Sequence, residues 1–477
     1  MKFKISYLTT GVFCLIVAVL SYYTLVNYPG RVVIYIIFTI VINSLFVIGF
    51  TKNRIFFDTF IGIFLWLGFW LKLSVRIAFL NGEFQEPIGM FNKTGVEYDH
   101  ALLVTCCGVV ALLFASFIRR RFLFSYKIIA DKGRFRAVFD FYRNHRKIIL
   151  ALFVFLFLTI AITNSTLGIY QRGSVPRTAL PMGLSGIYTW LLLFGMASFS
   201  AVILDCEFRL KNNPYFVSIL TLLECFFSNV SMLSRGLILN GGSLYIGISE
   251  NAKKRYINPS LQYRIIIMII LGILFISSVV AVNHIRSYLF FSVSPNLLKS
   301  STSSMLEPIA RSGRNIQTLL IDRWVGIEGV MAVVSYPNLG WSFWKKAWQE
   351  KYQHFGTSMY DRKILEYKYS DIHLSQHHFI NLPGILAFFY YPGSFIFLFI
   401  SMFFLGLLAS AIEWSVYKLS GANIILCSLI GQVVAYRYTH FGYVPSQSYL
   451  LFGSIFLNVI MIYLLNKYLN FRKKQFK

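Results

Sequence analysis

Arginines close to the ends of long apolar runs are the side chains in this sequence best suited to binding a charged ligand. Six of them are candidates for one site: Arg235, Arg286, Arg311, Arg314, Arg323 and Arg437. A guanidinium presents a planar fork of N–H donors that matches the oxygens of a phosphate. A diphosphate is therefore one ligand that such a group would suit, and each residue also has a simpler interpretation.

The segment 314–337, RNIQTLLIDRWVGIEGVMAVVSYP, predicts a helix. At 100° per residue its apolar side chains form one stripe, and Arg323 lies near the middle of that stripe. An arginine on a buried face needs an anionic partner, because leaving a desolvated charge unpaired costs several kcal/mol. The partner of Arg323 is either a carboxylate or free carbonyls of the protein, or a phosphate of the substrate.

Arg437 and His440 mark the outer loop between the eleventh and twelfth runs, close enough in principle to complete a pocket. The remaining arginines carry similar alternatives. Arg311 and Arg314 are three residues apart and share a helical face, which suits either a diphosphate or a solvated surface. Arg235 lies in a predicted hairpin between two apolar runs, and Arg286 directly follows the ninth run. Both would either bind the ligand or extend to lipid head groups.

Two residues are candidates for a general base. His377 and His378 are adjacent, so at most one of them can face a given point, and His378 is the first choice. Glu328 is the second choice. The simpler interpretation of His378 is a polar loop residue.

Composition places the chain in a membrane. Of its residues 56% are hydrophobic and only 13% are charged, whereas soluble domains carry about 25% charged residues. The net charge of +26 follows the excess of Lys and Arg expected in short cytoplasmic loops. No motif of a nucleic-acid-binding protein is present, so we exclude nucleic acid as a partner.

Twelve apolar runs are long enough, or nearly so, to cross a bilayer as helices. They are 6–26, 32–50, 56–79, 100–118, 148–163, 184–204, 215–233, 236–249, 265–283, 384–411, 421–437 and 447–466. Lys and Arg collect in alternate loops, which predicts that both termini are cytoplasmic. A retained first helix is favoured over a cleaved signal peptide, because no small-residue cleavage site follows the first run.

Two segments stand apart from these runs and divide the chain. The basic cytoplasmic segment 119–147 is either a helix on anionic lipid or a linker. Residues 284–383 form an outer loop that is too long to be a simple connection. We therefore divide the chain into helices one to nine (1–283), the outer loop domain (284–383) and helices ten to twelve with a basic tail (384–477).

Several functions are disfavoured by what the sequence lacks. Glu224 is the one acidic residue well inside a run, whereas coupled transporters usually need intramembrane carboxylates. None of the six cysteines lies in the outer loop, so neither a disulfide framework nor a zinc cluster is predicted there. The first outer loop, 27–31, has no acid to hold a divalent metal. P-loop, nucleophile-elbow, zincin and dinucleotide motifs are missing in the required context.

The layout resembles that of the bacterial O-antigen polymerases of the Wzy type, and the related O-antigen ligases look similar. The resemblance rests on about twelve runs with a long outer loop between the ninth and tenth, and on short motifs. These motifs are Ser234-Arg235-Gly236 at a hairpin, Asp322-Arg323-Trp324-Val325-Gly326 before an apolar helix, and Leu382-Pro383-Gly384 with Tyr391-Pro392-Gly393 and Phe404-Leu405-Gly406 at the tenth run.

The resemblance implies an all-α membrane glycosyltransferase of the GT-C type, with a helical periplasmic loop, in the bacterial inner membrane. It would polymerise undecaprenyl-diphosphate-linked oligosaccharides into surface polysaccharide, such as the O antigen of lipopolysaccharide, without a metal or cofactor. A Wzz-type chain-length regulator would be a partner, besides membrane lipid. The six arginines would bind the diphosphates and His378 or Glu328 would assist the attack. An O-antigen ligase or a lipid-linked oligosaccharide flippase are the alternative functions.

Overall fold

Every regular element of the described chain is a helix. The computed structural model describes residues 2–51, 55–124, 126, 135–210, 214–234, 236–254, 260–291, 321–352, 357–366 and 380–475. The helices are α1 Lys2–Asn27, α2 Val32–Ile48, α3 Phe56–Leu65, η1 Trp66–Leu71, α4 Lys72–Phe79, α5 Gly95–Ile118, η2 Arg119–Leu123, α6 Arg136–Leu167, η3 Pro181–Gly183, α7 Leu184–Trp190, η4 Leu191–Gly195, α8 Met196–Leu210, α9 Pro214–Ser231, α10 Leu237–Lys254, α11 Leu261–Phe291, α13 Ile327–Val334, α14 Trp341–Trp348, α15 Met359–Lys363, α17 Ile385–Phe389, α18 Phe395–Leu419, α19 Ile424–Thr439, η6 Pro445–Gln447 and α20 Ser448–Gln475. The all-helical prediction is confirmed for these residues.

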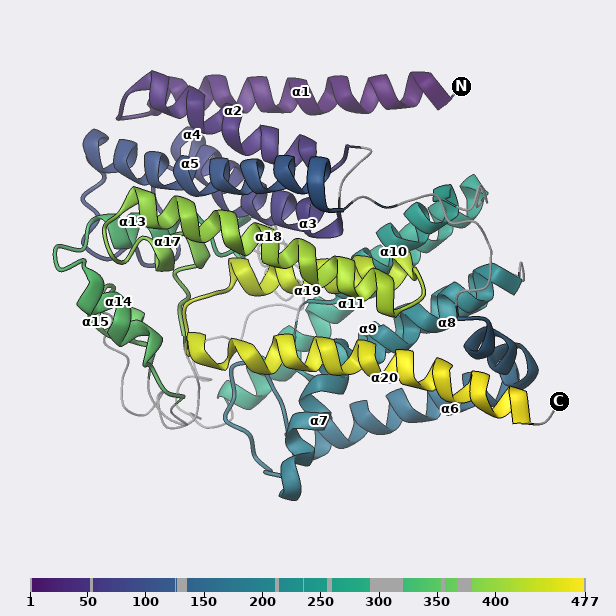
Figure 1. Cartoon of the computed structure of the whole chain (residues 1–477). Coiled ribbons are helices and arrows are strands. Elements are labelled where there is room, and N and C mark those ends of the chain that lie inside the picture. Colours follow the sequence, from purple (N-terminus) through teal and green to yellow (C-terminus); the bar gives the residue numbers. More distant parts are fainter. Residues whose placement is uncertain are drawn as a thin grey trace, which may run out of the picture.

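The long helices form a bundle whose two ends differ (Figure 1). α1 begins and α20 ends at the same end of this bundle. The short helices α13, α14, α15 and α17 gather at the opposite end. In the orientation predicted from the basic loops, the first end is cytoplasmic and the second faces outward; we use "outer end" for the second throughout.

Length and composition identify the helices that are able to cross a bilayer. Seven described helices or runs of helix qualify: Phe56–Phe79, Gly95–Phe122, Arg136–Leu167, Pro181–Leu210, Gln262–Arg286, Phe395–Leu419 and Pro445–Arg472. Four further apolar helices are shorter: Gly11–Asn27, Val32–Ile48, Tyr215–Ser231 and Ile424–Thr439. The eighth predicted run coincides with α10, which belongs to neither group. These features support a helical membrane protein, whereas the count of twelve spans stays a prediction.

Polar caps explain where several helices begin. Thr94 and Glu97 form a reciprocal capping box at the start of α5. Ser394 caps α18 and Asn423 caps α19, each by accepting a hydrogen bond from a backbone N–H three residues on. Since the first N–H groups of a helix have no partner within it, these caps define the helix starts.

Two predicted helices differ from the structure. The tenth run was expected to be one helix over 384–411, but it is broken between α17 and α18, where Gly393 has φ +74° and Pro392 precedes it. The prediction of one continuous helix over 314–337 is wrong, because residues 322–326 between the helical Ile321 and α13 (Ile327–Val334) are not helical. Arg323 precedes α13 instead of lying in its apolar stripe.

The basic segment 119–147 is divided between two helices in its described part. Arg119–Leu123 continue α5 as one turn of π-helix (η2), and residues 136–147 form the first turns of α6. α6 is bent at His145, whose φ of −117° and ψ of 23° are not helical. Within the described part of this segment, residues 119–123 and 136–147 are therefore helical, whereas residues 124, 126 and 135 are not.

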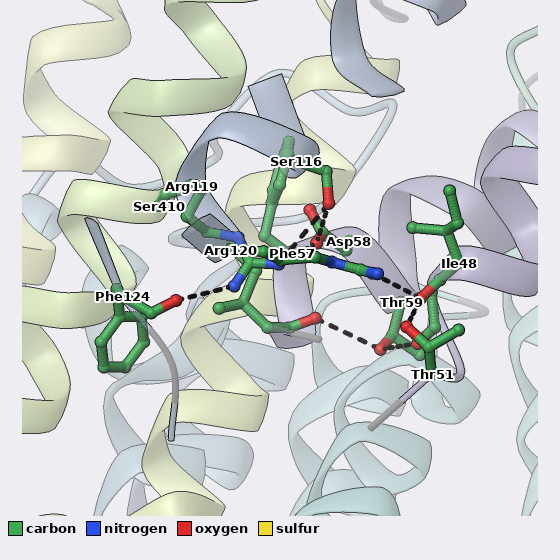
Figure 2. A network of polar contacts seen from close by, with 12 residues as sticks. Ile48, Thr51, Phe57, Asp58, Thr59, Ser116, Arg119, Arg120, Phe124 and Ser410 are labelled. Atoms are coloured by element: carbon green, nitrogen blue, oxygen red, sulfur yellow. Dashed lines mark hydrogen bonds and ion pairs between the residues drawn. The ribbon is translucent and has the colours of Figure 1, made fainter. Parts of the chain in front are cut away.

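A buried polar network joins helices at the end of the bundle opposite the outer end (Figure 2). Arg119 Nη2 lies 2.8 Å from Asp58 Oδ2, and Ser116 donates to the same oxygen at 2.7 Å. Glu413 of α18 accepts hydrogen bonds from the backbone N–H groups of Phe56 and Phe57 at 2.8 and 2.9 Å. Its negative charge therefore lies at the N-terminus of α3, where the helix dipole favours it.

We expect Arg119→Met to destabilise the protein by about 3–5 kcal/mol, because it leaves the Asp58 carboxylate buried without its cation. Unfolding by SDS in mixed micelles measures this. Arg121→Met is the control, since the Arg121 side chain is exposed. Adding Asp58→Asn to Arg119→Met should recover part of the loss. Equal stability of the Arg119 and Arg121 variants would contradict a structural role for this ion pair.

Candidate functional site

A fully buried lysine attaches the outer loop domain to the helix bundle. Lys72, the first residue of α4, has a side chain that is 0% exposed, and its Nζ lies 2.8 Å from Glu328 Oε1. The same ammonium donates to the carbonyl oxygens of Asp322 and Trp324 at 2.8 and 2.6 Å. All three donors of the ammonium therefore hold the segment that runs from Asp322 into α13.

A second cation from the same helix completes this attachment. Arg76 Nε donates to Asp322 Oδ1 at 3.1 Å, and its Nη2 contacts the same oxygen. Lys72 and Arg76 were not among the residues predicted for the site, although the sequence contained a signal for them. Both are cations inside a predicted span, four residues apart on one helical face, and buried charges in such a place usually have a function.

Two glycines allow the backbone of the outer loop to touch the bundle. A Cβ on Gly326 would lie 1.8 Å from the carbonyl oxygen of Gly68 in η1. A Cβ on Gly329 would lie 2.0 Å from the carbonyl oxygen of Pro383. Only glycine permits these approaches without a shift of backbone, so these two contacts help to place the residues between them, including Glu328.

A cavity of about 670 Å³ lies at the outer end of the bundle. Its wall is formed by the loop after α6, by α7 with η4, by the turn between α9 and α10, and by α19 and the start of α20. Trp190, Leu193, Leu450 and Leu451 make much of the wall apolar. The volume lies within the range of sites that hold small molecules or cofactors.

Two arginines line this large cavity. The Arg172 guanidinium carbon lies 5.9 Å from the centre of the Tyr436 ring, and Arg437 Nη2 donates to Ser448 Oγ at 3.0 Å. Arg437 Nε is buried and has no hydrogen-bond partner among the described residues, and the same is true of Gln432 Oε1. The cavity wall therefore combines positive charge with buried polar atoms that have no partner among the described residues.

Arg286 supports this wall from α11. Its Nη2 donates to the backbone carbonyl oxygen of Arg172 at 2.9 Å. The Arg172 backbone N–H donates in turn to the carbonyl of Met232 beside the α9–α10 turn. Arg172 is thus tied both to α11 and to the hairpin of α9 and α10.

A smaller cavity of about 210 Å³ lies under the outer loop domain. Lys72, Asp322, Arg323 and Glu328 line it together with Glu86 from the loop before α5. Tyr360 and Asn381 complete a strongly polar wall. Surrounding protein and the Glu328 carboxylate raise the pKa of Glu86, although its side chain remains accessible to solvent.

His440 belongs to the walls of both cavities. It follows the last residue of α19, and its ring stacks on that of Tyr436 with a centroid distance of 3.9 Å. Burial and the neighbouring Arg323, Arg172 and Arg437 guanidiniums lower the pKa of His440 to about 3. Its imidazole is therefore neutral at physiological pH.

The structure brings together half of the residues predicted for the site. Arg286, Arg323, Arg437 and Glu328 are described and lie at the outer end, at or next to the two cavities. Arg235, Arg311, Arg314 and His378 lie outside the described residues. Glu328 is paired with Lys72, and burial raises its pKa while Lys72 opposes that change. Its role as a base stays a prediction.

Arg172 was not among the residues predicted for the site, and His440 was placed beside Arg437 as part of a pocket without a chemical role. Both stood in predicted outer loops, but a short loop says nothing about which other loops it meets. Within the described part of the chain, no group of three or more His, Cys, Asp or Glu residues could hold a metal ion. No family model, curated protein or solved structure matches the chain.

We expect Lys72→Met to destabilise the protein by about 3–5 kcal/mol, since the Glu328 carboxylate loses its buried cation. Lys93→Met is the control, because its ion pair with Glu83 is largely exposed and should contribute less than about 1 kcal/mol. SDS titration of both variants measures the difference. Adding Glu328→Gln to Lys72→Met should restore stability in part. Additive losses in the double variant would show that the two residues do not interact.

Proposed function

We propose that this protein is a membrane glycosyltransferase that polymerises polyprenyl-diphosphate-linked oligosaccharides at the outer end of its helix bundle. More specifically, the protein would be an O-antigen polymerase of the GT-C type in the bacterial inner membrane, with twelve spans and cytoplasmic termini. Its substrates would be undecaprenyl-diphosphate-linked repeat units, with a chain-length regulator as a partner. The resemblance of the sequence motifs and the chemistry of the two cavities support this proposal.

The charge of the large cavity's wall is the main observation in support of this proposal. Arg172 and Arg437 line the large cavity, while no aspartate or glutamate does among the described residues that form its wall. Positive charges that are partly removed from water need an anion, because unpaired charge is costly in such surroundings. An anionic ligand is therefore the natural partner, and paired guanidiniums match the oxygens of a diphosphate.

The remainder of the wall suits the lipid part of such a substrate. The apolar residues contributed by α7, η4 and α20 face the same space as the two arginines. A polyprenyl diphosphate has the same combination, namely a charged head beside a long apolar chain. In the predicted orientation the cavity opens near the outer membrane surface, where such a lipid presents its sugars.

These residues also fit the chemistry of transfer. When the bond between the sugar and the diphosphate breaks, negative charge develops on the leaving oxygen. Arginines already in position stabilise this charge without reorganisation, and such preorganised stabilisation is often the largest contribution to catalysis. Arg172 and Arg437 would contact the diphosphate, Arg323 would add its charge from the neighbouring cavity, and Arg286 would hold the backbone of Arg172.

We expect Arg172→Lys to reduce polymerisation roughly tenfold or more, because lysine keeps the charge but loses the bidentate fork. The assay contains purified protein in nanodiscs, a synthetic undecaprenyl-diphosphate repeat unit and EDTA, and polymer is resolved as a ladder on a gel. Arg177→Lys is the matched control, since Arg177 lies in the same loop but is exposed.

A ladder that forms in EDTA and is lost in Arg172→Lys alone supports the proposal. Folded wild-type protein that makes no ladder from the repeat unit of its own strain contradicts it. Transfer of the same donor to lipid A core oligosaccharide would then indicate a ligase. Movement of the intact lipid between leaflets without transfer would indicate a flippase.

A further inference from the structure

Two cavities with different walls meet at the imidazole of His440, which suggests that each cavity binds a different substrate. The large cavity has arginines and an apolar wall, as a lipid-linked donor requires. The small cavity has two cations of its own, Lys72 and Arg323, but combines them with carboxylates, an amide, a phenol and the indole of Trp324. Carboxylates and amides hydrogen-bond to hydroxyl groups and an aromatic face packs on apolar C–H surface, so this wall suits a sugar. His440 is common to both walls.

The hydrogen bonds of His440 determine which of its nitrogens is available. Nδ1 lies 3.2 Å from the backbone carbonyl oxygen of Tyr436, which can only accept, and 3.0 Å from the Thr439 hydroxyl. That hydroxyl can donate to the carbonyl oxygens of Tyr436 and Ala435, at 3.0 and 3.3 Å, so it does not need Nδ1 as an acceptor. We therefore assign the proton of the neutral ring to Nδ1, which leaves the lone pair on Nε2. The stack on Tyr436 at 3.9 Å restricts the orientation of the ring.

We propose that the small cavity binds the acceptor sugar, and that His440 Nε2 accepts the proton of its attacking hydroxyl. This inference rests on the proposed function. The hydroxyl oxygen forms a bond to the anomeric carbon of the donor, while the bond from that carbon to the diphosphate oxygen breaks. The hydroxyl proton moves to Nε2 and is then passed to the departing diphosphate or to water, which restores the neutral ring.

The surrounding charges make this base depend on the donor. Without a ligand, the guanidiniums of Arg323, Arg172 and Arg437 oppose a further positive charge and hold the pKa of His440 low. A diphosphate in the large cavity compensates for that positive charge, because an anion close to an imidazole stabilises its protonated form. His440 thus becomes an effective base only when the donor is bound, and this protects the donor from wasteful reaction.

The test separates donor binding from transfer. The donor is an undecaprenyl-diphosphate repeat unit whose own acceptor hydroxyl is replaced by hydrogen, and the acceptor is the lipid-free repeat unit with a fluorescent label. We expect His440→Ala to lower the transfer rate about 100-fold or more, with donor affinity within about twofold of wild type. Added imidazole should restore part of the rate, which no merely structural role predicts.

The chain supplies a matched control for His440. His145 on α6 makes the same local contacts, with Nδ1 3.1 Å from the carbonyl oxygen four residues before it and its ring 4.7 Å from that of Phe141. It is exposed and lies in neither cavity wall. His145→Ala should therefore transfer at the wild-type rate.

A second pair of variants tests the acceptor cavity. We expect Glu86→Gln to raise the acceptor KM several-fold without changing donor affinity, because it alters a group in the small cavity only. Glu83→Gln, three residues away and exposed with Lys93 as its partner, is the control.

The results for the His440→Ala and Glu86→Gln variants test the two parts of the inference separately. Transfer by His440→Ala close to the wild-type rate would overturn the role of His440. Loss of donor binding in that variant, or no rescue by imidazole, would also overturn it and make His440 part of the donor site. An unchanged acceptor KM in Glu86→Gln would overturn the acceptor cavity. In all these cases wild-type transfer persists, whereas failure of the wild type to transfer at all would overturn the proposed function itself.

Discussion

The buried ammonium of Lys72 is the constraint on which the outer end of this protein depends. A lysine without access to water must give each of its N–H groups a strong acceptor, or the charge becomes prohibitively costly. Here the acceptors are Glu328 and the carbonyls of Asp322 and Trp324, all from the outer loop domain. A loop that is far away in the sequence is therefore held against the third predicted span, and Arg323 and Glu328 take their places at the small cavity.

Charge is organised differently at the two ends of the bundle. At the end opposite the outer end, Arg119 is paired with Asp58 and Glu413 lies at the N-terminus of α3, so these charges are compensated within the protein. In the large cavity at the outer end, Arg172 and Arg437 stand in a wall without acidic residues among those described. The first arrangement favours stability, whereas the second leaves positive charge that a ligand can neutralise.

The neutral state of His440 follows from the same concentration of charge. Three guanidiniums around one imidazole repel a fourth positive charge, so the ring keeps a lone pair on Nε2. The stack on Tyr436 and the backbone hydrogen bond come from α19 itself, so the orientation of the ring is a local property. Its environment, by contrast, is assembled from the outer loop domain, the loop after α6 and the end of α19.

The sequence by itself determined that this is a helical membrane protein. Long apolar runs with few charges form helices that are buried away from water, and local hydrophobicity suffices to recognise them. The sequence also placed several arginines where the chain leaves the apolar runs. Only the tertiary structure decided which of them meet. Arg172 and Arg323 join the neighbouring pair Arg437 and His440 through contacts between segments far apart in the chain, and no periodicity encodes such contacts. The helix predicted over 314–337 is interrupted at residues 322–326 for the same reason. Its apolar stripe is real in α13, but the carbonyls of residues 322 and 324 bind Lys72 instead of continuing a helix, since a buried ammonium outweighs local propensity.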